Sequence, residues 1–105
     1  MKLEEVKDVV KLLQSKGWSD LKIRSKVKES SGTIDIIATS KGLKKKTMLV
    51  IISTDIYDAQ IANMLFDGIP KKYLKVILLE EGDPFFVEHD DDVKIVSSPE
   101  ALPDS

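Results

Sequence analysis

The stretch Gly32-Thr33-Ile34-Asp35-Ile36-Ile37-Ala38 decides the fold of this 105-residue chain. Its pattern predicts a β-strand that is apolar on both faces except for one carboxylate, that of Asp35. A carboxylate that is buried without a partner is costly, so such a group normally shifts its pKa, binds a metal or accepts hydrogen bonds. The residues that face Asp35 from the neighbouring strand therefore decide what this position can do.

The regions on either side of this stretch predict one helix and two further strands. Apolar residues recur every three or four positions in residues 3–16, which predicts a helix that Gly17 ends. Strict alternation of apolar and basic residues predicts a half-exposed strand over residues 21–28. The continuous apolar run in residues 47–53 predicts a strand in the centre of a sheet.

The second half of the chain predicts a crossover unit. Residues 55–67 have the pattern of a helix, residues 73–79 that of a buried strand, and residues 93–96 that of a short edge strand. Because a crossover through a helix joins parallel strands, the strand at 73–79 is expected to lie parallel to the preceding one. The predicted fold class is therefore α/β (α+β): a mixed sheet with a three-stranded antiparallel meander plus a parallel strand, and helices at its sides.

Length and composition indicate a single domain, residues 1–105. The chain is long enough for one core, expected over about residues 3–80 and followed by an acidic C-terminal extension, residues 81–105. No apolar run approaches the roughly 20 residues that cross a bilayer, so no membrane partner is expected. The absence of cysteine excludes disulfides and thiolate metal sites and fits a cytoplasmic protein.

Charge is distributed unevenly along the chain. Residues 1–54 contain 12 Lys/Arg and 6 Asp/Glu, whereas residues 55–105 contain 4 and 12, although the net charge is only −2. Clustered cations neutralise phosphates, so the first half predicts weak, salt-sensitive nucleic-acid binding. The alternative is that these cations are solvent-exposed residues of an edge strand that prevent it from pairing with the strands of other molecules. The residues concerned, called the basic set below, are Lys22, Arg24, Lys26, Lys28, Lys41, Lys44, Lys45 and Lys46.

The order of elements, with Gly-x-x-Asp-Ile-Ile-Ala opening the second strand, resembles the restriction-endonuclease-like fold. Within that fold, residues 3–80 are similar to the PD-(D/E)xK nucleases, especially the small archaeal Holliday-junction resolvases. The resemblance implies a site where the second-strand Asp and a Glu-x-Lys on the third strand act with Mg²⁺ on a phosphodiester. Asp35 matches the first position, but Ile51 stands at the Glu position and Ser53 at the Lys position.

Three hypotheses of function follow from this comparison. The first is a catalytically degenerate nuclease-like protein without a cofactor, associated with nucleic acid or acting as a scaffold; the resemblance to symmetric resolvases implies a homodimer. The second is an active Mg²⁺-dependent endonuclease whose missing groups come from elsewhere in the chain. The third is a protein-interaction subunit that uses the acidic C-terminal half. For the second, the candidate replacements are Asp55, Glu4, Glu5, Asp8 and Gln60.

Asp35 has a structural alternative to metal binding. Its carboxylate is then expected to accept hydrogen bonds from Ser53, from Thr33, from a nearby lysine or from backbone amides. His89 lies in an acidic run, Glu88 to Asp92, and is expected to be a solvent-exposed side chain rather than a cation ligand.

Overall fold

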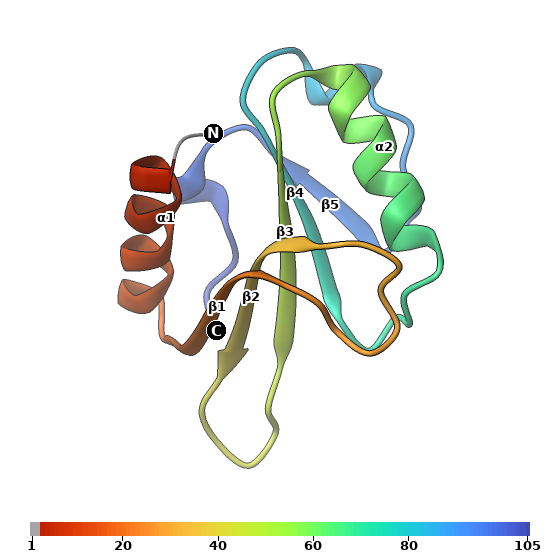
Figure 1. Ribbon diagram of the computed structural model, residues 1–105. Helices are drawn as coiled ribbons and strands as arrows, with labels where there is room; N and C mark the ends of the chain where they lie inside the picture. Colours follow the sequence, from red (N-terminus) through yellow and green to blue (C-terminus); the bar gives the residue numbers. More distant parts are fainter. Residues whose placement is uncertain (1–2) are drawn as a thin grey trace.

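The computed structural model describes residues 3–105, with side chains from Glu5 onward, and consists of a five-stranded mixed sheet and two α-helices (Figure 1). The strands lie in chain order across the sheet. The first three pair antiparallel, and the last three pair parallel. This confirms the α+β class, the antiparallel meander and the parallel crossover strand. The strands are β1 (Trp18–Ser25), β2 (Ile34–Ser40), β3 (Thr47–Ser53), β4 (Leu74–Leu79) and β5 (Val93–Val96).

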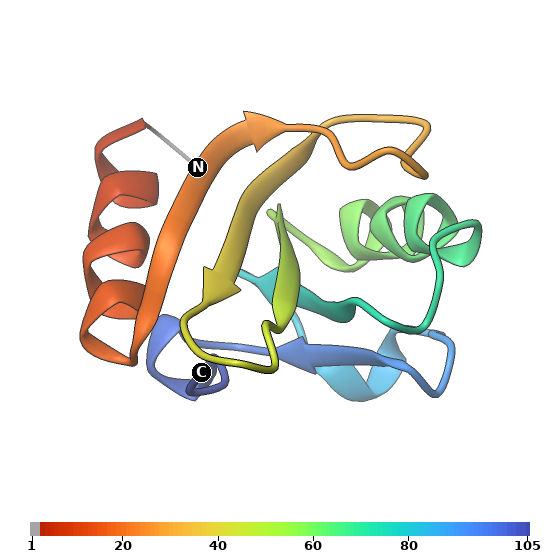
Figure 2. The ribbon, with the colours of Figure 1, turned by 90° about the horizontal axis from the view of Figure 1, so that it is seen from below.

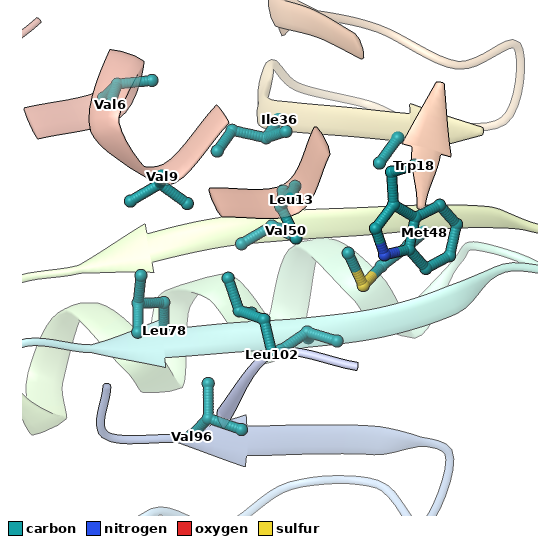
Figure 3. Close-up of a cluster of buried hydrophobic side chains, with 12 residues drawn as sticks. Val6, Val9, Leu13, Trp18, Ile36, Met48, Val50, Leu78, Val96 and Leu102 are labelled. Atoms are coloured by element: carbon teal, nitrogen blue, oxygen red, sulfur yellow. The ribbon is translucent and has the colours of Figure 1, made fainter. Parts of the chain in front are cut away.

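Helix α1 (Leu3–Ser15) packs one apolar face against the sheet. Val6, Val9 and Leu13 recur at helical spacing and are all buried. Gly17 follows the helix with φ +98°, a left-handed conformation that glycine adopts without strain, so the predicted stop is confirmed. Figure 3 shows the resulting α1-side core. Its buried members are Val6, Val9, Leu13, Trp18, Ile36, Ala38, Met48, Val50, Val76, Leu78, Val96 and Leu102.

Helix α2 (Ile56–Asp67) covers the opposite face of the sheet, over β3 and β4 (Figure 2). The side chain of Asp55 caps it by accepting a hydrogen bond from the backbone N–H of Asp58 at 2.9 Å. The buried residues between this helix and the sheet form the α2-side core: Ile34, Ile37, Leu49, Ala59, Ala62, Phe66, Ile69, Ile77, Leu79, Val87 and Val93.

Strand β1 differs most from the sequence prediction. It begins at Trp18, which is buried, and ends at Ser25, so the predicted range of 21–28 is wrong by three residues at each end. Arg24 has φ +50° and breaks the regular alternation just before the strand ends. Lys26 and Lys28 therefore lie in the connection to β2, and the expectation that four basic residues share one strand face is wrong.

The C-terminal segment is part of the fold rather than an appendage. The short 3₁₀ helices η1 (Pro84–Phe86) and η2 (Pro99–Ala101) flank β5, which pairs with β4. Leu102 is buried in the α1-side core, and the indole N–H of Trp18 donates to the carbonyl of Pro103 at 2.9 Å. The core thus extends well past residue 80. Within residues 3–105, neither helix has the length and apolar character needed to cross a membrane.

Candidate functional site

Asp35 lies where β2 and β3 separate. The pairing of these strands runs from Thr39 opposite Thr47 to Ile36 opposite Val50 and ends there. Beyond that point, Asp35 Oδ2 accepts a hydrogen bond from the backbone N–H of Ile52 at 2.7 Å. The carboxylate therefore takes the place of a main-chain acceptor that β2 no longer supplies. Asp35 is half-buried rather than enclosed, which corrects the expectation of a dry carboxylate.

The positions corresponding to the Glu-x-Lys motif contain no second charge. Strand alternation places Ile51 and Ser53 on the α2 side of the sheet. Ile51 packs against the α2-side core. Ser53 is 1% exposed, and its hydroxyl has no hydrogen-bond partner among the described residues. The expected bond from Ser53 to Asp35 is therefore wrong, whereas the expected bond from a backbone amide is present.

This donor set does not fit Mg²⁺. The ion requires several oxygen ligands in a near-octahedral arrangement, and it dehydrates reluctantly. Asp35 offers one carboxylate, of which one oxygen already accepts the Ile52 N–H. In the part of the chain from residue 3 onward, no group of three or more acidic or histidine side chains is placed to hold a metal ion.

Two of the residues that could replace the missing Glu and Lys, Asp55 and Gln60, form other hydrogen bonds at α2. Asp55 caps α2, as described above. Gln60 binds both main-chain groups of Glu88: its Nε2 donates to the Glu88 carbonyl, and its Oε1 accepts from the Glu88 N–H, each at 2.8 Å. Gln60 thus fastens the acidic loop to α2 and contributes nothing to Asp35.

The candidates from α1 lie elsewhere. Glu5 and Asp8 line a cleft of about 380 Å³ together with Glu80 and Glu100. Asp35 is not among the residues that line this cleft. The side chain of Glu4 lies outside the described residues.

An apolar groove between β3 and α2 is lined by Ile51 and Ser53, the positions at which the resemblance implies the Glu and Lys of the catalytic centre. Its volume is about 230 Å³. One charged side chain reaches it, that of Asp58, which accepts hydrogen bonds from the Thr54 hydroxyl at 2.6 Å and the Thr54 N–H at 3.2 Å. These bonds hold the pKa of Asp58 below its ordinary value. The residues lining the groove are Ile51, Ile52, Ser53, Asp58, Ile61, Ala62 and Leu65.

The basic set is exposed but is spread over the edge strand β1, the connection after it and the β2–β3 hairpin. Lys22 on β1 and Lys26 in the following connection line a common cavity of about 80 Å³, so these two are brought together. Lys44, Lys45 and Lys46 lie in the β2–β3 hairpin, at the opposite end of β2 from that connection (Figure 1). Among the described residues, none of the basic set forms an ion pair with a carboxylate.

A buried ion pair that the sequence reasoning missed lies on β4. Lys75 is only 4% exposed, and its ammonium donates to Asp92 Oδ2 at 2.8 Å and to the carbonyl of Ile69. The hydrogen bond from Lys75 lowers the pKa of Asp92. The available signal was the lysine itself, which interrupts an otherwise apolar strand just as Asp35 interrupts β2.

Further aspartates surround this pair and tie the acidic loop to α2. The Asp67 carboxyl group lies close to that of Asp90 and raises the pKa of Asp90, because the two groups can share a proton but repel each other when both are ionised. The backbone N–H of Asp90 donates to Asn63 Oδ1 at 3.2 Å. His89 is exposed, as expected, and its ring contacts the carbonyl of Asp90. These contacts hold the loop in place rather than forming a reactive centre.

Comparison with known proteins adds no family to this description. No protein-family model matches the chain, and no curated protein or solved structure matches it either. The likeness to PD-(D/E)xK nucleases therefore stays a prediction from the residues and the order of elements.

Proposed function

We propose that this chain is a catalytically degenerate PD-(D/E)xK nuclease-like protein that binds nucleic acid without cleaving it. The observation that carries the proposal is an incomplete metal site next to an edge of exposed, unpaired cations. The α-β-β-β-α-β order and the position of Asp35 on the second strand support the ancestry.

The missing groups argue against hydrolysis. A metal-dependent nuclease uses its ion to stabilise charge on the scissile phosphate and to generate hydroxide. Holding that ion requires more than one carboxylate beside the phosphate. Here Ile51 and Ser53 stand where the resemblance implies Glu and Lys, and the one remaining carboxylate accepts a main-chain N–H. Asp35 is thus a structural residue in this proposal.

The exposed cations support binding. Strand β1 lies at the edge of the sheet (Figure 2). Lys22 and Arg24 lie on it, and Lys26 and Lys28 lie in the connection that follows it. An eight-residue strand extends roughly 25 Å, and DNA presents a phosphate about every 3.4 Å along each strand. This length spans about seven phosphates of one DNA strand. Three cations, Lys22, Arg24 and Lys26, lie on the strand or just after it, so simultaneous contact with about three phosphates is expected, with no reading of base sequence.

Fluorescence anisotropy with labelled duplex, single-stranded and four-way-junction DNA and with RNA tests this proposal. The double variant Lys22→Glu/Lys26→Glu should weaken binding by at least about tenfold at about 50 mM salt, because it reverses the charge of the two cations that the fold brings together. The matched control is Lys7→Glu/Lys11→Glu, which changes the net charge equally on the exposed side of α1. Equal weakening by both variants, or no binding by the wild type, would overturn the proposal.

A further inference from the structure

Helix α2 exposes an apolar stripe beside the groove described above. Tyr57, Ile61 and Met64 are 76%, 51% and 74% exposed and recur at i, i+4 and i+7, so they lie along one side of the helix. Ile61 also lines the groove between α2 and β3. The stripe and the groove therefore form one continuous apolar surface, larger than the isolated apolar side chains that ordinary surfaces carry.

The charged residues of β3 and α2, the two elements that form this surface, are all negative. Residues 47–70 contain Asp55, Asp58 and Asp67 and no lysine or arginine. Asp58 lines the groove itself, and its lowered pKa keeps it ionised at neutral pH. An occupant of this surface should therefore present an apolar side chain flanked by cations.

The β2–β3 hairpin loop of this chain, residues 41–46, has that chemistry. Leu43 stands fully exposed at its tip, with a relative exposure of 107%. Its neighbours in the loop are glycine and lysines only: Lys41, Gly42, Lys44, Lys45 and Lys46. The loop thus places one aliphatic side chain at the centre of four positive charges.

The loop cannot reach the groove of its own chain. The hairpin precedes β3 at Thr47, whereas the groove lies at the other end of β3, around Ser53 (Figure 1). Six residues of extended strand separate these ends by roughly 20 Å. The two complementary surfaces therefore face away from each other within one molecule and can meet only between two copies.

We propose that the hairpin loop of one copy docks in the groove between β3 and α2 of a second copy. Leu43 enters the groove against Ile61 and Leu65, and the loop lysines face Asp55 and Asp58. If both copies dock reciprocally, the contact closes into a twofold dimer; if they dock in one direction only, copies add head to tail. Apolar packing of Leu43 contributes to this contact as well as charge. The contact can therefore be tested separately from nucleic-acid binding.

Sedimentation velocity over a wide concentration series tests the contact. The wild type should self-associate, more weakly as salt is raised. Leu43→Ser and Ile61→Ser should each weaken association by at least about tenfold, the size expected when an aliphatic anchor is lost from an interface. Both side chains are exposed in the single chain, so neither change threatens folding. Phe85→Ser, at another exposed apolar side chain, is the matched control and should associate like the wild type.

Mixing the two variants gives the decisive comparison. Leu43→Ser retains the groove and Ile61→Ser retains the loop, so an equimolar mixture should recover association that neither variant shows alone. A wild type that stays monomeric, a Leu43→Ser variant that associates like the wild type, or a mixture that behaves like its components would each overturn the proposal. Leu43→Ser leaves every lysine in place, so at protein concentrations where the wild type is monomeric its nucleic-acid binding should be unchanged, which separates this contact from the proposed function.

Discussion

Asp35 and Lys75 each interrupt an apolar strand, yet the fold accommodates them differently. Asp35 is half-buried, and a neutral backbone N–H is its hydrogen-bond partner. Lys75 is almost completely buried, and a carboxylate and a carbonyl accept its protons. The first lies where two strands separate, and the second lies between two strands of an intact sheet.

The difference follows from access to water. At the opening between β2 and β3, solvent still reaches the carboxylate, so one hydrogen bond suffices. On β4, α2 and the acidic loop exclude water, and a charge there requires a counter-charge. Of the two sites, the ion pair of Lys75 and Asp92 has the more elaborate set of electrostatic contacts, and it holds a loop in place. Asp35 has the simpler set.

The largest expected effect comes from separating Lys75 from its partner. Asp92→Ala leaves a buried ammonium without its counter-charge, and we expect the free energy of unfolding to fall by about 3 kcal/mol, because removal of one partner from a buried pair typically costs 3–5 kcal/mol and Asp92 retains some exposure. Urea denaturation monitored by Trp18 fluorescence measures the change.

The double variant Lys75→Met/Asp92→Leu is the control for that prediction. Replacing both members of a buried pair by apolar residues of similar size is often neutral or stabilising, so this variant should unfold close to the wild type. An Asp92→Ala protein as stable as the wild type would show that Lys75 reaches water, and the contrast with Asp35 would disappear.

Asp35 should give a smaller effect that depends on the replacement. Asp35→Asn keeps an acceptor for the Ile52 N–H and removes a partly buried charge, so its stability should equal or slightly exceed that of the wild type. Asp35→Ala leaves that N–H without its partner and should cost about 1–3 kcal/mol in the same urea assay. A large loss in Asp35→Asn would mean that the negative charge itself anchors the structure.

Gln60 provides a test of how the acidic loop is held. Gln60→Ala removes both hydrogen bonds to the Glu88 backbone, and exposed bonds of this kind contribute about 0.5–1 kcal/mol each. Because the effect is local, amide exchange of residues 84–91 should accelerate while β3 and β4 remain protected. Uniform acceleration across the chain would contradict a local fastening role.

The order and type of the elements could be predicted from the sequence because they depend on local patterns. The apolar run of β3 and the crossover through α2 fixed the parallel pairing, and Gly17 and Asp55 marked helix ends. The end of β1 could not be predicted, because the left-handed conformation of Arg24 breaks an alternation that continues in the sequence to Lys28, with only Ser25 out of pattern.

The partners of the buried charges could not be predicted from the sequence for a different reason. Lys75 and Asp92 are 17 residues apart and meet only because β5 returns to pair with β4. The sequence shows that Asp35 and Lys75 are charged residues within apolar strands, and that each therefore needs a partner or access to water. It does not show which strand opens beside the first or which loop closes over the second.

The smallest expected effect is a pH dependence with opposite signs at two aspartates. The pKa of Asp92 is lowered in the folded state, so its contribution to stability is present above the ordinary pKa of about 3.9 and is lost as pH falls through the folded value. The pKa of Asp90 is raised, so its contribution is present at low pH and is lost as pH rises through the folded value. Asp90→Asn should therefore raise Tm slightly at pH 7, where the Asp67 and Asp90 carboxylates repel each other.

That gain should vanish in acid, and the pH profile is its control. Thermal unfolding of the wild type and Asp90→Asn, compared at pH 7 and below pH 4, gives the two values. A gain that persists in acid would show that repulsion from Asp67 is not its cause.

One measurement tests the central claim most directly: incubation of the wild-type protein with labelled duplex and junction DNA in Mg²⁺ or Mn²⁺, with anisotropy and gel analysis of the same samples. The account predicts binding that weakens with salt, with a log–log slope of roughly −3, and DNA that remains intact throughout. Cleavage by the wild type that disappears in Asp35→Ala would contradict it and identify an active nuclease.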